Sequence, residues 1–141
     1  MRIMAIDYGD AHTGIAISDP TGFLAGFTTT INAYRPEAVA EQIARLAAEH
    51  GAEELVLGHP KNMDGTLGPR AEKAEVMAAM LREVTGLPVV LWDERRTTID
   101  AHQILMNSGK NAKKRKKTVD AVAASLILEG YLTYKKSHPN E

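Results

Sequence analysis

The chain has 141 residues, which is the length of a single domain with a sizeable core. Its hydrophobic fraction of 44% and charged fraction of 25% exclude the disordered and fibrous classes. It has no cysteine, which excludes disulfides and thiolate metal sites, and its five histidines lack the spacing of a zinc site. A charged residue follows the N-terminus too early for a signal peptide, and no apolar run is long enough to cross a membrane. We therefore expect one cytoplasmic domain, residues 1–141, with no membrane association.

The net charge of −1 is unevenly distributed. Residues 110–117 hold six of the 17 lysines and arginines, which leaves 11 positive against 18 negative side chains, or −7, for the remainder. A basic segment on an acidic body indicates attraction of phosphate at one place. The alternative is a solvated loop whose charge only keeps the protein soluble. In either case we expect a loop at 110–117, and a flexible tail at about 136–141.

The first third of the chain predicts three antiparallel strands. Apolar runs at 2–7 and 14–18 flank a turn-like segment at 9–13, which is typical of a hairpin. Residues 23–31, rich in threonine and phenylalanine, can supply the third strand.

The rest of the chain predicts alternating helices and strands. A helix begins at Pro36 and ends before Gly51, with an apolar face formed by Val39, Ile43, Leu46 and Ala47. The next elements are a strand at 55–58, a helix at 69–85, a strand at 87–92, a helix at 97–108, and a last helix from the N-cap Thr118 to 134. The helix at 69–85 stops before Gly86 and is expected to bury Ala74, Met77, Leu81 and Val84. This order predicts an α/β fold: a mixed five-stranded sheet, three antiparallel strands and then parallel ones, with helices on both faces.

Three acidic residues that are far apart in the sequence are candidates for one site: Asp7, Glu94 and Asp120. Ligands of such sheets bind beyond the carboxyl ends of the strands, where Asp7 and Glu94 are expected. Asp120 falls in the first turn of the last predicted helix, and the small residues at 121–125 would let that helix pack closely on the sheet. Carboxylates are costly to desolvate unless a cation pairs with them, and a hard divalent ion binds several oxygens at once. The three acids therefore predict a site for Mg²⁺ or Mn²⁺.

Each acid also has a structural explanation. Asp7 precedes a turn and could accept turn hydrogen bonds, while Asp120 could be favoured by the helix dipole alone. At Asp93 and Glu94, one acid is expected to face the site and the other to pair with Arg95 or Arg96, and the sequence does not decide which. A surface cluster of ion pairs is the structural alternative there.

Donors suited to phosphate oxygens surround these acids. Arginine can bind phosphate in bidentate fashion, and glycine permits close approach to the backbone. The candidate substrate-binding residues are Gly9, Asn62, Arg95, Arg96, Lys113, Lys114, Arg115, Lys116 and Lys117. Acids for a metal beside bases for phosphate indicate phosphodiester chemistry.

Four groups of segments follow one another along the chain: 5–9 with 14–19, 57–60 with 62–65 and 68–72, 90–95 with Thr97 and Thr98, and 113–117 with Asp120, Ala121, Ala123 and Ala124. In this combination the chain resembles, from about residue 3 to 134, the YqgF family of RNase H-like, Holliday-junction-resolvase-like bacterial nucleases. The combination is specific, whereas any single segment would be a weak match.

The resemblance implies an RNase H-like fold and a metal-dependent nuclease site at Asp7, Glu94 and Asp120. It also implies processing of the 5′ end of precursor 16S ribosomal RNA, with structured RNA as substrate and ribosomal particles as partners. Resolution of branched DNA junctions is the alternative. Two residues depart from the family pattern: Asp10 replaces a small hydroxyl residue, and His59 replaces an apolar one. Asp10 is expected to add negative charge near the metal.

Two other functions remain open. A phosphotransferase of the actin and sugar-kinase type has a similar strand-turn-strand phosphate loop, here 7–18, but needs two facing domains where this chain has room for one. A non-catalytic nucleic-acid-binding module is the other, although such domains tend to lose the acids that this chain retains.

Overall fold

The computed structural model describes residues 2–19, 25–59, 68–93 and 112–137. The elements within these ranges are β1 (Ile3–Asp7), β2 (His12–Ser18), β3 (Ala25–Asn32), α1 (Pro36–His50), β4 (Glu54–His59), α2 (Pro69–Thr85), β5 (Val89–Asp93) and α4 (Ala112–Ser137). The helix expected at 97–108 lies outside the described residues. No helix in the part of the chain that the structure describes has the length and apolar character needed to span a bilayer.

Five strands form one mixed sheet in the order β3-β2-β1-β4-β5. The β1–β2 and β2–β3 pairs are antiparallel, whereas β4 pairs in parallel with both β1 and β5. This arrangement confirms the predicted sheet. It also places the carboxyl ends of the three parallel strands, β1, β4 and β5, at one edge.

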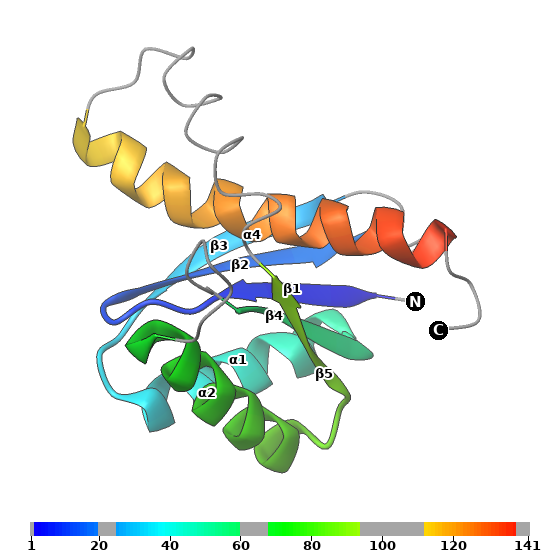
Figure 1. The fold of residues 1–141 in the computed structure, drawn as a ribbon, viewed down its shortest axis with the longest axis horizontal. Coiled ribbons are helices and arrows are strands. Elements are labelled where there is room, and N and C mark those ends of the chain that lie inside the picture. The colour runs from blue at the N-terminus through cyan, green and yellow to red at the C-terminus, as the bar shows by residue number, and fades with distance from the viewer. Residues whose placement is uncertain (1, 20–24, 60–67, 94–111, 138–141) are drawn as a thin grey trace.

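Helices cover both faces of the sheet, with α4 on one face and α1 and α2 on the other (Figure 1). Successive residues of a strand point to opposite faces, and β1 follows this rule. Met4 and Ile6 belong to the core beneath α1 and α2, while Ile3 and Ala5 belong to the core beneath α4. The alternation therefore also assigns a face to Asp7, the last residue of β1.

The bounds of α2 agree with the sequence prediction at both ends. Proline occupies the first turn, and Gly86 follows with a φ of 69°, a left-handed conformation that glycine adopts without strain. The expected burial of Val84 is wrong, because its side chain is 54% exposed. In the last turn of the helix the half-buried residue is Thr85, whose hydroxyl donates a hydrogen bond of 2.6 Å to the Leu81 carbonyl oxygen.

The start of α4 corrects a second expectation. Thr118 is not an N-cap, and residues 112–117 are not a loop, because the helix begins at Ala112. Alanine, lysine and arginine all have high helix propensity, and neither proline nor glycine interrupts the segment before the apolar stripe that packs on the sheet. The helix also continues to Ser137, so the expected tail cannot begin at 136. Residues 138–141 lie outside the described residues.

Candidate functional site

Asp7 ends β1 at the edge where the parallel strands finish. It shares its pleat with Ile3 and Ala5, so its position lies on the face that α4 covers. It is half-buried and pairs with Gly14 of β2 across the hairpin. Among the described residues, no cation forms an ion pair with its carboxylate. A half-buried carboxylate in this setting is costly unless a cation compensates it.

Asp93 lies on the opposite face. Val89 and Leu91 of β5 belong to the core under α1 and α2, whereas Val90 and Trp92 belong to the core under α4. The alternation therefore assigns Asp93 to the side of α1 and α2, away from Asp7. Glu94, the next residue, lies outside the described residues.

His59, which ends β4, pairs in register with Asp93 and is buried on that same side. Its Nε2 atom lies 3.3 Å from Oε1 of Glu75 in α2, but the two groups are not aligned for a hydrogen bond. His59, which departs from the family pattern, is therefore a buried residue that packs against α2 and does not lie beside Asp7.

The direction of α4 is fixed by contacts at its C-terminal end. Tyr131 donates a hydrogen bond to Glu54, the first residue of β4, and Lys135 forms an ion pair with Glu54 at 2.9 Å. Glu54 pairs in register with Ile3, at the start of β1. The helix therefore runs antiparallel to β1, and its N-terminal half extends toward the edge where Asp7 lies (Figure 1).

The described part of α4 buries one stripe of residues against the sheet. The buried residues of this stripe are Ala124, Ile127, Leu128, Tyr131 and Leu132. Asp120 precedes Ala124 by four residues, which is about one turn. It also comes eight residues after Ala112, the start of the helix, so a dipole effect confined to the first turn does not explain an acid here.

The β1–β2 turn accounts for Gly9 in structural terms. A Cβ atom at this position would collide with the backbone carbonyl oxygen of His12. The Gly9 amide donates a hydrogen bond of 3.5 Å to the Thr13 hydroxyl, which closes the turn. The glycine is thus required by the hairpin itself, whether or not it also contacts a substrate.

Asp10 has a partner of its own, which sequence analysis missed. Its carboxylate accepts a hydrogen bond of 2.9 Å from Nζ of Lys73 in α2. The contact with Lys73, and more weakly the charge of Arg70, lower the pKa of the Asp10 carboxyl. The carboxylate that was expected to add negative charge near a metal is therefore paired with a cation of α2. The sequence signal that could have indicated this partner is the pair of cations Arg70 and Lys73, three residues apart at the start of the helix.

The remaining predicted site residues are described in part or not at all. Asn62, Glu94, Arg95 and Arg96 lie outside the described residues, and for Lys113, Lys114, Arg115, Lys116, Lys117 and Asp120 the structure describes the α4 backbone only. Within the ranges that are described, no group of three acidic, histidine or cysteine side chains could hold a metal ion. Asp7 is the one predicted metal ligand whose side chain belongs to those ranges.

Comparisons with known proteins agree with the fold described above. A relative from Halothermothrix orenii, named "Putative pre-16S rRNA nuclease", is 46% identical over 135 residues, which is 96% of each chain. The structure described as T. thermophilus RuvC in complex with Holliday junction substrate has a TM-score of 0.66 and 14% identity, covering 97% of this chain and 96% of that one. This likeness confirms the predicted RNase H-like fold.

A ROK hexokinase from Thermus thermophilus is also similar, with a TM-score of 0.52 and 23% identity. The match covers 73% of this chain but only 38% of the hexokinase, so this likeness shows a shared fold for one part of a larger enzyme.

The family model described as "RuvX: Holliday junction resolvase" matches residues 1–134. That match covers the hairpin bearing Asp7, the parallel strands and nearly all of α4. It confirms the resemblance drawn from the sequence motifs. With the relative that is 46% identical over almost its whole length, it shows that this chain belongs to the RuvX family.

Proposed function

We propose that this protein is a divalent-metal-dependent nuclease whose site is formed by Asp7, Glu94 and Asp120. The observation that carries the proposal is the position of Asp7: a half-buried carboxylate, without an ion pair to any described cation, on the α4 face of the edge where three parallel strands end. Oxygen ligands of this kind fit Mg²⁺ or Mn²⁺.

Lengths along α4 and β1 support a meeting of Asp120 with Asp7. Tyr131 and Ile3 both lie level with Glu54, through the hydrogen bond and the strand register. From that level, Asp7 is four strand residues away, or about 13 Å. Position 120 is eleven helical residues away in the same direction, or about 16 Å. The difference is less than one helical turn.

The alternation of β5 supports Glu94 rather than Asp93 as the third acid. Val90 and Trp92 lie on the α4 face, two residues apart. If the alternation continues past the end of β5, residue 94 falls on that same face. Asp93 follows Val89 and Leu91 in the alternation, and both of these belong to the core on the opposite face.

In this proposal the residues of the chain have the following roles. The three carboxylates would hold the metal ions, and the basic residues would hold the scissile phosphodiester next to them. Bound ions would supply an activated water and stabilise the departing oxygen. Lys113 to Lys117, Arg95 and Arg96 bind the phosphate backbone through charge, and Gly9 and Asn62 contact it from the adjoining loops. Such contacts position the strand without selecting bases.

The substrate that we propose is the 5′ region of precursor 16S ribosomal RNA, within ribosomal particles in the cytoplasm. The name of the relative that is 46% identical contains pre-16S rRNA, without specifying the 5′ region. Branched DNA is the second candidate, favoured by the description of the family model.

One experiment tests both candidates. The purified protein is incubated with a precursor 16S RNA fragment spanning the mature 5′ end, or with a four-way DNA junction. Each substrate is tested with Mg²⁺, with Mn²⁺ and with a chelator. We expect metal-dependent cleavage of the RNA near the mature end. Cleavage of the junction alone would select the second candidate, and cleavage that survives chelation would contradict the metal site.

A further inference from the structure

A second group of charges lies at the same edge of the sheet, but on the side of α2. Arg70 and Lys73 are three residues apart in α2 and therefore lie on one face of the helix. They line a small hollow together with Tyr8, Gly9 and Asp10 of the β1–β2 turn. Asp7 begins this same turn, so the group adjoins the proposed nuclease site although it lies on the other side of the sheet.

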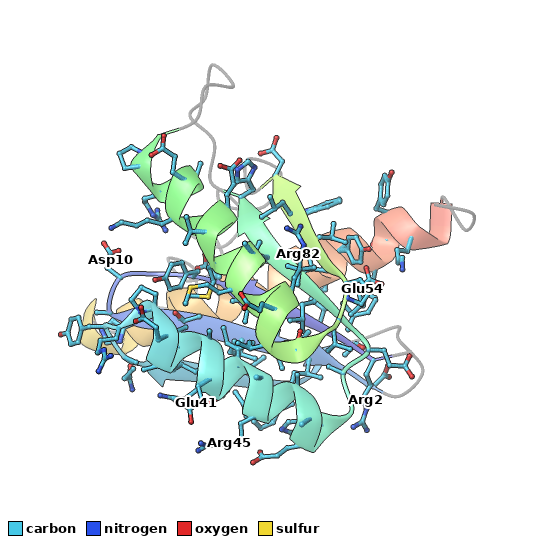
Figure 2. All side chains as sticks on the ribbon, turned by 90° about the horizontal axis from the view of Figure 1, so that it is seen from below. Arg2, Asp10, Glu41, Arg45, Glu54 and Arg82 are labelled. Carbon is cyan, nitrogen blue, oxygen red and sulfur yellow. The ribbon has the colours of Figure 1, made fainter. Side chains whose placement is uncertain are left out.

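The two cations are accessible. The side chain of Lys73 is 55% exposed, and that of Asp10 is 77% exposed. Arg70 is exposed and forms no ion pair with any residue in the described ranges. Figure 2 shows Asp10 at the end of the molecule opposite Arg2 and Glu54, which mark the amino ends of the parallel strands.

Asp10 holds Lys73 by a contact that a stronger anion can replace. An exposed ion pair between flexible side chains contributes little to stability, because water already solvates both charges. The carboxylate oxygen at 2.9 Å from Nζ stands where a phosphate oxygen would bind. With Arg70 beside it, the group offers two positive charges to a phosphate and one competing negative charge.

We propose that Arg70 and Lys73 form a second phosphate-backbone contact of the substrate, and that Asp10 weakens this contact by competing for Lys73. The inference depends on the proposed function in one respect, namely that the ligand is the nucleic acid. The substrate would then cross the carboxyl edge of the sheet between α2 on one side and α4 on the other. A chain with a small hydroxyl residue at position 10 would have the same cations without the competitor.

Binding measured without metal tests this inference apart from catalysis. The full chain is titrated with the precursor RNA fragment, labelled for fluorescence anisotropy, in a chelator and at several potassium chloride concentrations. The variants are Asp10→Asn, Lys73→Gln, Arg70→Gln and the double variant Asp10→Asn/Lys73→Gln. The matched control is Glu41→Gln, which breaks an exposed ion pair with Arg45, 3.3 Å long, on α1.

We expect Lys73→Gln and Arg70→Gln each to lower affinity about five- to tenfold at 0.1 M salt and to reduce the salt slope by about one. Asp10→Asn should raise affinity by about threefold or more and steepen the slope, as expected when a phosphate contact becomes easier to form. The double variant should lose this gain, because the cation that Asp10 restrained is absent. Glu41→Gln should give only the small change that removing one distant negative charge produces.

The outcomes separate the two proposals. Equal effects of Asp10→Asn and Glu41→Gln would overturn the role of Asp10, and unchanged affinity in Lys73→Gln and Arg70→Gln would overturn the second contact. In both cases a wild-type protein that still binds and cleaves leaves the proposed function intact. A wild-type protein that binds no nucleic acid contradicts the proposed function and this inference together.

Discussion

Tyr131 of α4 donates a hydrogen bond to Glu54, the buried first residue of β4. Lys135 lies 2.9 Å from the other carboxylate oxygen and 5.5 Å from the centre of the Tyr131 ring. Tyr131 and Glu54 are 77 positions apart in the sequence. The contact among these three residues holds the end of α4 that is distant from Asp7. It thereby sets which residues of α4 lie level with the carboxyl edge.

We expect Tyr131→Phe to destabilise the protein by about 1–3 kcal/mol, the range for losing a hydrogen bond to a buried charged group. The ring and its packing against Trp92 remain, so the loss comes from the hydroxyl. Urea unfolding followed by circular dichroism measures the change. Tyr34→Phe is the control, because Tyr34 is 80% exposed and its hydroxyl should contribute little. Equal stabilities of the two variants would contradict a structural role for the Tyr131–Glu54 bond.

The same tyrosine predicts a loss of stability at alkaline pH. Burial, and then the hydrogen bond to Glu54, raise the pKa of the Tyr131 hydroxyl above its ordinary value of 10.0. The folded state therefore keeps this proton at a pH where the unfolded state releases it. The stabilisation is complete below pH 10 and is lost progressively as the pH rises above it.

Urea unfolding between pH 9 and 11 should show stability falling more steeply in the wild type than in Tyr131→Phe. The difference should approach about 1.4 kcal/mol per pH unit, which is the limit for one proton. The variant should retain some dependence, because burial also raises the pKa of Tyr8. Parallel pH profiles of the two proteins would argue against the raised pKa of Tyr131.

Gly9→Ala should destabilise the β1–β2 hairpin by about 1–3 kcal/mol, the usual cost of forcing an extra methyl group into a filled space. The new Cβ atom would collide with the His12 carbonyl oxygen, which belongs to the backbone and cannot rotate away. Thermal unfolding checks the expectation. Gly26→Ala is the control, since a Cβ atom there would have its nearest neighbours at 3.4 Å, an ordinary contact distance. A Gly9→Ala variant as stable as this control would mean that the turn can relax.

The parts of the fold that the sequence predicted correctly have local signals. The helix α2 agrees at both ends because Pro69 and Gly86 determine where a helix can begin and stop. The start of α4 was missed because Thr118 carries a capping signal, whereas the preceding lysines carry a distributed helix propensity that no single residue reveals.

The parts that were missed depend on pairing in three dimensions. The contact of Asp10 with Lys73 joins residues 63 positions apart, on a turn and a helix that only the folded sheet brings together. The choice between Asp93 and Glu94 likewise requires knowing which face of β5 meets α4. Sequence alternation gives two faces but does not say which one is covered by which helix.

Asp7→Asn should abolish metal-dependent cleavage while leaving the melting temperature unchanged or higher. The amide removes a negative charge from the proposed metal ligands, so metal binding weakens and repulsion among the three acids falls. Cleavage assays with saturating Mg²⁺ and Mn²⁺, alongside calorimetric melting, measure both effects. Turnover at the wild-type rate in this variant would remove Asp7 from the site. A loss of turnover accompanied by a large fall in melting temperature would show that Asp7 acts in folding instead.

The pair Glu94→Gln and Asp93→Asn distinguishes the two faces of β5. Asp93 ends the strand on the side of α1 and α2, in register with His59, so its amide variant should retain most cleavage activity. Alternation along β5 favours the α4 face for Glu94, so its amide variant should lose cleavage as Asp7→Asn does, because one of three metal ligands is neutralised.

Titration of each variant with Mn²⁺ provides a second measure that does not depend on turnover. The affinity for Mn²⁺ should fall in Glu94→Gln and Asp7→Asn and remain near the wild-type value in Asp93→Asn. The reverse pattern, with Asp93 essential and Glu94 dispensable, would overturn the assignment of Glu94 to the site.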